Sequence, residues 1–403
     1  LNIGLYVDQR LNIPQGPNII LISIDTLRAD HLGCYGYSKN TTSNIDTFSK
    51  ESVLFKNCIA QAPNTTSSHA SLFTSLIPSH HQAAKNAQAM ITHNAVTIGE
   101  ILKNYNYHTI SYNGGGQVAA NFGFDRGFDI YNSEEDKGFD NIVHHAKKWI
   151  QNNHQGKKFF MFLHTYETHH PYTPKKEFFD MLESNYRGTF SGDITIKLLE
   201  EIKNGKKSID ENDLRYIVDK YDAEILSMDK AFGAFITFLK KAGLYDSAMI
   251  IFTSDHGEEF NEHGKVGWHA HTLYDELLKV PLLIKFPNAQ YAAATIDSQV
   301  QSIDLLPTIV DILQIEPFDY FEGINLMPLI DHRNTDKAKY AVSQKEDRDY
   351  ALVSIRTQKW KLQIEHKYDD IAGNPVYYKM LFDLENDPGE ITDFSRENDE
   401  VVD

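Results

Sequence analysis

Acidic and imidazole side chains stand directly after several short apolar runs that have the length of β-strands. Asp25 follows NIILISI, Asn113 follows HTISY, His164 follows FFMFL, and the pair Asp255 and His256 follows AMIIFTS. Because ligands bind beyond the carboxyl ends of the strands in an open α/β sheet, we expect these side chains to share one edge of a sheet. A single aspartate at a strand end is equally well explained as a helix cap or a loop anchor. Two carboxylates and an imidazole, Asp25, Asp255 and His256, suit a divalent cation, so together they predict a metal site.

A run of hydroxyl side chains, PNTTSSHASLFTS from Pro63 to Ser75, opens polar and ends apolar. This pattern is typical of a helix amino terminus. A hydroxyl there would lie in positive potential beside free N–H groups, which favours an anionic nucleophile and a bound tetrahedral oxyanion. Taken alone, however, the run favours the simpler interpretation of a well-capped helix.

Histidines gather in two segments that follow the predicted strands. The segments are HTYETHHPYTP and EHGKVGWHAHTLYDE, and the chain has 18 histidines in all. Their members are His164, His169, His170, His263, His269 and His271. Each one alone is more often structural, but loops at the carboxyl edge of a sheet are where site residues accumulate. The two segments flank the predicted metal site.

The elements that must position these residues alternate between strands and helices. Expected strands are Asn18–Ile24, Tyr107–Tyr112, Phe159–Leu163, Ala248–Thr253 and Pro281–Ile284. Expected helices are Thr97–Tyr105, Phe139–Gln151, a long one from about Asn212 to Ala242, and Ile303–Leu313. Apolar strands alternating with helices predict an α/β fold with a mostly parallel sheet covered by helices.

The pattern changes after about Leu329. A polar link, HRNTDKAK, is followed by three alternating segments, Tyr350–Arg356, Lys359–Ile364 and Tyr377–Leu384, that predict a small antiparallel sheet. We therefore divide the chain into an N-terminal extension (1–17), a catalytic domain (18–330) and a small C-terminal α+β subdomain (331–403).

Composition excludes some partners. The 403 residues carry a net charge of -17, which repels nucleic acid and anionic membranes at long range. An anionic substrate therefore needs a local positive centre, such as a metal ion. Two cysteines, Cys34 and Cys58, do not form a disulfide framework, although they could pair with each other if oxidised. No apolar run approaches the ~20 residues of a transmembrane helix, so any membrane link is expected in a segment before Leu1.

The segment NIILISIDTLRADH, continuing into GCYGYSKNTT, resembles the amino-terminal signature of sulfatases, a branch of the alkaline phosphatase superfamily. The family motif C-x-P-S-R-x-x-x-L-T-G, whose cysteine becomes formylglycine, aligns with TTSSHASLFTS. Thr65 then takes the cysteine position, Ser68 the serine and His69 the arginine. The resemblance runs from about Asn18 to Glu390.

Further segments carry the same resemblance. FFMFLHTYETHHPYTP is similar to the substrate-contacting histidine segment, with His169 at its histidine, and TSDHGEEFNEHG is similar to the second metal segment. GINLMPLI and LFDLENDPGE resemble C-terminal landmarks of the family. The resemblance implies the alkaline phosphatase/sulfatase-like fold.

Three departures from the family pattern bear on function. The paired aspartates after the first strand are here Asp25 and Thr26, and NGGGQ replaces the Lys-x-His pair. Thr65 cannot become formylglycine. The threonine version is similar to phosphoethanolamine transferases, lipoteichoic acid synthase and nucleotide phosphodiesterases. Their metal-binding set matches Asp25, Thr65, Asp255 and His256.

The resemblance thus implies a metal-dependent hydrolase or transferase of phosphate or phosphonate esters with Thr65 as nucleophile. The ion would be Zn²⁺, Mn²⁺ or Ca²⁺, without formylglycine. Candidate catalytic residues besides Thr65 are His69, His164, His169 and His271, for substrate contact, leaving-group protonation or a second metal. Candidate substrate-binding residues are Asn113, Lys265 and His269.

Two rival functions remain open. One is a sulfate-ester hydrolase working without formylglycine, and the other is an inactive protein that keeps the fold for binding. The expected substrate is a small-molecule, glycan or lipid-linked phosphate or sulfate ester. The resemblance implies a periplasmic, secreted or membrane-tethered location outside the cytoplasm.

Overall fold

The computed structural model describes residues 16–83, 90–133, 138–154, 156–182, 184–332, 340–347, 350–368 and 375–397. An eight-stranded sheet, ordered β10-β2-β9-β6-β1-β5-β3-β4, forms its centre. The strands are β1 (Asn18–Ile24), β2 (Val53–Ile59), β3 (His108–Asn113), β4 (Ile130–Ser133), β5 (Phe159–Thr165), β6 (Ala248–Ser254), β9 (Lys279–Lys285) and β10 (Thr295–Gln301). Neighbours run parallel except at β9, which is antiparallel to β2 and to β6. The predicted α/β fold with a mostly parallel sheet is confirmed.

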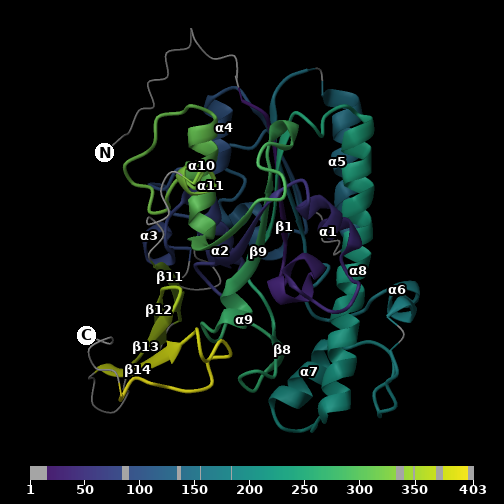
Figure 1. Cartoon of the computed structure of the whole chain (residues 1–403), viewed down its shortest axis with the longest axis vertical. Coiled ribbons are helices and arrows are strands. Elements are labelled where there is room, and N and C mark those ends of the chain that lie inside the picture. The colour runs from purple at the N-terminus through teal and green to yellow at the C-terminus, as the bar shows by residue number, and fades with distance from the viewer. Residues whose placement is uncertain are drawn as a thin grey trace.

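Helices cover both faces of this sheet (Figure 1). One face carries α1 (Ser43–Ser49), α5 (Phe139–Asn153) and α8 (Glu211–Lys241). The other carries α2 (Thr65–Thr74), α4 (Ile98–Asn104) and α10 (Leu305–Ile312). Shorter elements are η1 (Ala29–His31), η2 (Gly33–Tyr35), α3 (Pro78–His81), η3 (Gly116–Val118), η4 (Ala120–Phe122), α6 (Lys176–Met181), α7 (Ile196–Lys203), β7 (Glu259–Phe260), β8 (Val266–Trp268), α9 (Asp275–Leu278), η5 (Pro287–Ala289), η6 (Ser302–Asp304) and α11 (Met327–Ile330).

Strand alternation divides the core between the two helical layers. In β1 the side chains of Ile20 and Ile22 join the cluster beneath α5 and α8, whereas Ile19 and Leu21 join the cluster beneath α2 and α4. Successive strand side chains point to opposite faces, so a continuous apolar run fits a strand that is covered on both sides. Burial on both faces places β1 in the middle of the sheet, and its parallel pairing with β5 and β6 brings its last residues to the same edge as theirs.

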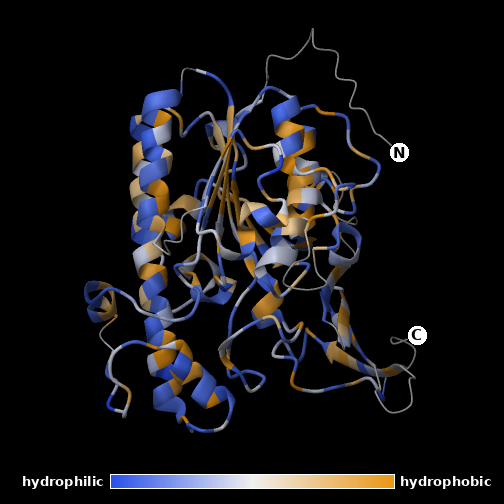
Figure 2. Ribbon diagram, turned by 180° about the vertical axis from the view of Figure 1, so that it is seen from behind, coloured by the Kyte–Doolittle hydropathy of each residue, from blue (hydrophilic) through white to orange (hydrophobic). Residues whose placement is uncertain are grey.

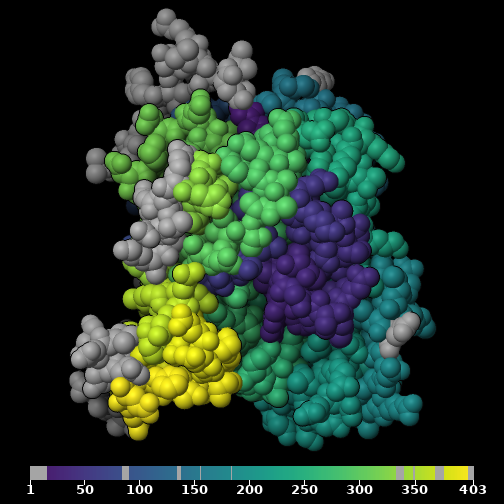
Figure 3. All heavy atoms as spheres, in the orientation of Figure 1, coloured from purple at the N-terminus to yellow at the C-terminus, as the bar shows by residue number. Residues whose placement is uncertain are grey.

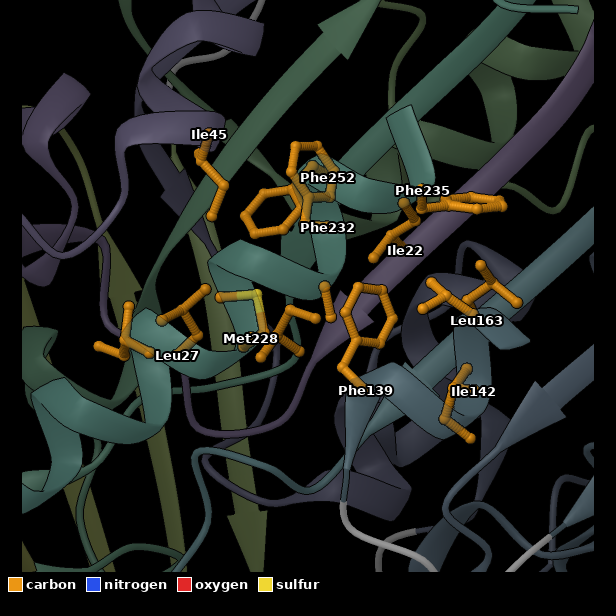
Figure 4. Close-up of a cluster of buried hydrophobic side chains, with 14 of the residues drawn as sticks. Ile22, Leu27, Ile45, Phe139, Ile142, Leu163, Met228, Phe232, Phe235 and Phe252 are labelled. Atoms are coloured by element: carbon orange, nitrogen blue, oxygen red, sulfur yellow. The ribbon is translucent and has the colours of Figure 1, made fainter. Parts of the chain in front are cut away.

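Helix α8 is the longest element and closes the first layer. Asp210 caps its start, because its carboxylate accepts hydrogen bonds from the backbone N–H groups of Asn212 (2.8 Å) and Asp213 (2.9 Å). Its apolar stripe packs on β1, β5 and β6, where Phe232 lies against Phe252 (Figure 4). Figure 2 shows that the central strands are largely hydrophobic, whereas α8 carries both hydrophobic and hydrophilic residues. No helix among the described residues has the length and hydropathy needed to span a bilayer.

A second sheet, antiparallel and of four strands, follows the first. Its strands are β11 (Ala341–Glu346), β12 (Tyr350–Arg356), β13 (Trp360–Tyr368) and β14 (Pro375–Asp383). The predicted small antiparallel sheet is confirmed, with one strand, β11, that the sequence pattern did not reveal. The proposed boundaries stay predictions, since 1–15 and most of the polar link (333–339) lie outside the described residues.

Buried ion pairs attach this second sheet to the first domain. Asp275 of α9 accepts hydrogen bonds from Arg356 (2.8 Å) and Lys361 (2.9 Å), and Glu390 pairs with Lys361 at 2.8 Å. In the space-filling view the C-terminal sheet lies beside the segment that contains η1 and η2 (Figure 3). A hollow of about 570 Å³ lies between them, lined in part by Arg28 and Arg356. It contains none of the predicted site residues.

Candidate active site

Asp25, Asp255 and His256 meet at the carboxyl edge of the large sheet, as predicted. Strands β1 and β6 pair in parallel, with Ile24 opposite Ser254, so the residues that follow them are neighbours in space. Ligand atoms of Asp25, Asp255 and His256 all lie within 4.8 Å of one another, and all three side chains are buried. The three residues that were predicted to meet because they follow strand ends are therefore close together in the structure.

The hydroxyl of Thr65 joins this group from the first position of α2. Its Oγ1 donates a hydrogen bond to Asp25 Oδ2 (3.1 Å) and lies 3.3 Å from His256 Nε2. His256 Nε2 is in turn 3.4 Å from Asp255 Oδ2. Ligands about 2.0–2.1 Å from a tetrahedral ion are separated by roughly 3.3 Å, so these spacings fit a shared cation.

Two further observations fit a cation at this position. Asp25 Oδ1 and Asp255 Oδ2 are buried and have no hydrogen-bond partner among the described residues. Burial raises the pKa of Asp25, and although burial also opposes protonation of His256, the adjacent Asp255 and Asp25 raise the pKa of that imidazole. Unpaired buried carboxylate oxygens are costly without a positive partner. The donor set, two carboxylates, one imidazole and one hydroxyl, therefore fits a divalent metal ion.

Hydrogen bonding also sets the tautomer of His256. Its Nδ1 lies 2.9 Å from the carbonyl oxygen of Gly257, which can only accept, so Nδ1 carries the proton. The lone pair of Nε2 then faces Thr65 and Asp255. This is the form of imidazole that binds a metal.

The amino terminus of α2 differs from the well-capped helix expected from the hydroxyl run. Asn64 is its N-cap residue but makes no capping hydrogen bond, and its Nδ2 donates instead to Ser67 Oγ (3.0 Å). Ser68 Oγ donates to the backbone oxygen of Asp255 (2.6 Å), which ties the helix to the end of β6. Backbone N–H groups without a side-chain cap, at the positive end of a helix dipole, suit an anion held beside Thr65.

His69 and His164 are fully buried next to the two carboxylates of the candidate metal site. His69 Nδ1 is 3.0 Å from the carbonyl oxygen of Thr65, and its Nε2 is 3.0 Å from Ser23 Oγ. His164 Nε2 is 3.4 Å from Asp25 Oδ2. Both rings are fully buried, and burial lowers the pKa of each to about 4, which keeps them neutral. Their position supports the backbone and carboxylate beneath Thr65; their predicted catalytic roles stay predictions.

A second group of imidazoles lies next to His256. His169, His170 and His269 bring one ring nitrogen each within 4.8 Å of one another. The rings of His269 and His256 are 4.5 Å apart between centroids, and those of His269 and His169 are 4.9 Å apart. The predicted substrate residue His269 thus lies next to the metal-ligating group, together with the predicted catalytic residue His169.

Three other predicted residues lie differently from what the sequence suggested. His271 is not part of the group formed by His169, His170 and His269. Its Nε2 lies 2.7 Å from Glu259 Oε2 instead. Lys265 lies between β7 and β8, and its backbone N–H bonds to Glu259. The Asn113 side chain is buried and engaged with Ser111 Oγ (2.8 Å) and the N–H of Gly115 (3.0 Å). In this geometry Asn113 stabilises the turn after β3 rather than presenting its amide to a ligand.

Glu258 is the site residue that sequence reasoning missed. It is fully buried, and its Oε1 lies 2.9 Å from His269 Nδ1. Burial opposes its ionisation, yet the charges of His269 and His170 and their hydrogen bonds hold the pKa of this carboxyl well below its usual range. Two adjacent glutamates follow the Asp-His pair, and nothing in the sequence distinguishes the one that faces the histidines.

Comparison with known proteins agrees with this geometry. The sulfatase family model matches residues 17–315, and a second model, the C-terminal region of N-sulphoglucosamine sulphohydrolase, matches residues 262–402. An N-acetylglucosamine-6-O-sulfatase of Bacteroides thetaiotaomicron is 22% identical over 93% of this chain and 82% of its own length. An arylsulfatase of Clostridium perfringens is 24% identical over 96% of this chain and 92% of its own.

Solved structures share the fold across nearly the whole chain. One, in complex with D-glucosamine-2-N,6-O-disulfate, has a TM-score of 0.78 at 20% identity and covers 96% of both chains. The phosphonate monoester hydrolase of Agrobacterium radiobacter has a TM-score of 0.74 at 18% identity, over 96% of this chain and 93% of its own. The chain therefore belongs to the sulfatase family of the alkaline phosphatase superfamily and is an ester hydrolase acting on sulfur or phosphorus esters.

Proposed function

We propose that the chain cleaves phosphate or phosphonate esters with Thr65 as a covalent nucleophile. The observation that carries this proposal is the position of Thr65 Oγ1, 3.1 Å from Asp25 Oδ2 and 3.3 Å from His256 Nε2 at the start of a helix. A hydroxyl held between a carboxylate and an imidazole, beside free helix N–H groups, is placed for attack on a tetrahedral anion.

The metal-ligating residues would be Asp25, Asp255, His256 and Thr65. A bound divalent ion (Zn²⁺, Mn²⁺ or Ca²⁺) would supply positive charge that lowers the pKa of the Thr65 hydroxyl and neutralises substrate oxygens. Formylglycine has no place in this scheme, because a threonine side chain offers one secondary hydroxyl and no thiol to oxidise.

The remaining chemistry falls to the residues of the chain. In the first half-reaction Thr65 Oγ1 bonds to phosphorus while the ester oxygen leaves, and the hydroxyl proton passes to Asp25 Oδ2, its hydrogen-bond acceptor. In the second, water or an acceptor alcohol attacks the phosphothreonine and gives its proton to His269 Nε2, which passes it to the ester oxygen expelled in the first half-reaction. The Thr65 oxygen leaves and recovers its proton from Asp25. Water as acceptor makes the enzyme a hydrolase, and an alcohol makes it a transferase.

The side chain of Thr65 favours phosphorus over sulfur. A formylglycine hydrate has two hydroxyls, so its sulfate ester can collapse by carbon–oxygen cleavage. Thr65 has one hydroxyl, and its sulfate ester could be broken only by a second attack at sulfur. A phosphothreonine can be resolved at phosphorus by the same in-line geometry that formed it.

A sulfate-ester hydrolase is the second candidate, since the named relatives are mostly sulfatases. The inactive binding protein considered from the sequence is not supported, because the relatives are ester hydrolases and Asp25, Thr65, Asp255 and His256 are all present and converge. As the physiological substrate we propose a small-molecule, glycan or lipid-linked ester. Two proteins of similar fold were solved in complex with D-glucosamine-2-N,6-O-disulfate and with a neocarrahexaose, which supports a glycan. We also propose a location outside the cytoplasm, on family membership alone.

The proposal is tested by a panel of 4-nitrophenyl esters with one leaving group: phosphate monoester, phosphate diester, phosphonate and sulfate. We expect phosphate or phosphonate turnover well above sulfate turnover in the wild type. Thr65→Ala should abolish it, and Thr65→Ser should retain part, because the oxygen survives while the methyl that restricts its rotamer is lost. Sulfate as the best substrate would instead establish the second candidate.

A further inference from the structure

We propose that Glu258 is a positioning residue that fixes the tautomer and ring orientation of His269 beside the nucleophile. The inference rests on the proposed function only in taking the surroundings of Thr65 as the reaction site. It assigns no contact between Glu258 and the substrate.

The contacts of Glu258 leave both of its oxygens occupied. Oε1 lies 2.9 Å from His269 Nδ1, and Oε2 accepts a hydrogen bond from the hydroxyl of Tyr172 (3.0 Å). Oε2 is also 3.6 Å from His170 Nδ1. The carboxylate and Tyr172 are both fully buried, so neither exchanges these partners with water. Buried, fully bonded carboxylates of this kind orient imidazoles.

The tautomer of His269 follows from these contacts. A carboxylate oxygen only accepts hydrogen bonds, so the 2.9 Å contact requires a proton on His269 Nδ1 and directs Nε2 away from Glu258. The Nδ1 of His169 also carries a proton, because it lies 2.5 Å from the carbonyl oxygen of His170, which can only accept a hydrogen bond. Nε2 is therefore the ring nitrogen of His269 that does not face Glu258, and the ring lies next to His256.

The loop that holds His269 is itself attached to the start of α2. The N–H of Ala270 donates to the backbone oxygen of Pro63 (2.9 Å), two residues before Thr65. With the backbone fixed by this bond and the ring fixed by Glu258, His269 keeps a constant position relative to Thr65. The ring of His269 would otherwise be free to rotate about its side-chain bonds.

The neighbouring pair, Glu259 and His271, offers a matched control. It has the same chemistry, with Oε2 2.7 Å from His271 Nε2, and Glu259 is also buried. His271 is not among the converging histidines His169, His170 and His269. Adjacent residues entering a strand point to opposite sides, so only the first glutamate faces the site.

The test is a double-mutant cycle on kcat with Glu258→Ala, His269→Ala and the double variant, using the best ester of the panel. We expect Glu258→Ala to lower kcat about 10–100-fold with little change in KM. In the His269→Ala background it should lower kcat by no more than about twofold, because its target is gone. Glu258→Gln, which keeps an acceptor oxygen, should recover part of the rate, and Glu259→Gln should stay near wild type.

An equal loss from Glu258→Ala in both backgrounds would overturn the proposal, since it would show an effect that does not pass through His269. A crystal structure of Glu258→Gln and Glu258→Ala gives a readout that needs no turnover. We expect the His269 ring to keep its place in the first variant and to lose it in the second. A ring unchanged in Glu258→Ala would refute positioning, whereas failure of Thr65 as nucleophile would leave this structural result intact.

Discussion

Replacing Asp255 with asparagine should abolish metal-linked stabilisation while the fold survives. Asp255 Oδ1 accepts hydrogen bonds from the N–H groups of His256 (2.9 Å) and Thr26 (3.3 Å), and the asparagine oxygen can keep both. Oδ2 has no hydrogen-bond partner and faces His256 Nε2 at 3.4 Å. The substitution therefore removes the charge that faces the cation and preserves the bonds that hold the loop.

The size of the effect can be worked out. A ligand present at 100 times its Kd stabilises the folded state by about 2.7 kcal/mol. An unfolding entropy of ~2.1 cal/mol/K per residue gives about 0.85 kcal/mol/K for 403 residues, so the expected rise in Tm is roughly 3 °C. Without metal, Asp255→Asn should be at least as stable as the wild type, because it relieves repulsion between buried carboxylates.

The assay is thermal unfolding with and without saturating metal, together with elemental analysis of the purified protein. Asp229→Asn is the matched control, because Asp229 is a buried carboxylate outside the site that accepts bonds from Asn44 and Ile45. That variant should lose stability yet keep the full metal-induced rise in Tm. An Asp255→Asn protein that still shows the rise, or still retains stoichiometric metal, would refute the assignment.

Three further predictions follow from the same structure. His269→Ala should reduce turnover at least ~10²-fold while His271→Ala stays within about threefold of the wild type, measured as kcat on one ester; the reverse ranking would contradict the site geometry. Asp275→Asn should lower the free energy of unfolding by about 3 kcal/mol in urea titrations, because it leaves the buried Arg356 without a carboxylate partner and Lys361 with Glu390 alone; a loss below about 1 kcal/mol would contradict this. Burial raises the pKa of Glu167 from 4.5 to about 7, so the unfolded state binds fewer protons between these values and stability falls as pH rises through them. Glu167→Gln should flatten that fall, and an unchanged slope of unfolding free energy against pH would refute it.

The convergence of Asp25, Asp255 and His256 could be predicted from the sequence because strand ends are set by long, buried apolar runs. Asp25 and Asp255 follow such runs, and their strands pair in parallel, so position along the chain translated directly into proximity. These apolar runs do not show whether a strand is parallel or antiparallel to its neighbours in the sheet. That is why the antiparallel course of β9, between β2 and β6, was not foreseen.

The histidine assignments were less predictable, for a physical reason. Between β6 and α9 the chain forms only two very short strands, so no continuous strand or helix period links position in the sequence to the side that a side chain faces. The sequence therefore could not tell whether His269 or His271 lies beside His256, nor which of Glu258 and Glu259 faces inward. Thr65 was selected by family resemblance, and the spacing to Asp25 now gives it a physical basis.

The most direct test of the central claim is a mass measurement on the peptide that contains Thr65. Wild-type enzyme should be quenched in acid during turnover of a phosphonate or phosphate ester and then digested. The account predicts a phosphonyl or phosphoryl adduct on Thr65, absent without substrate and absent from Thr65→Ala. Sustained turnover with an unmodified Thr65 peptide, or with the adduct on another residue, would contradict it.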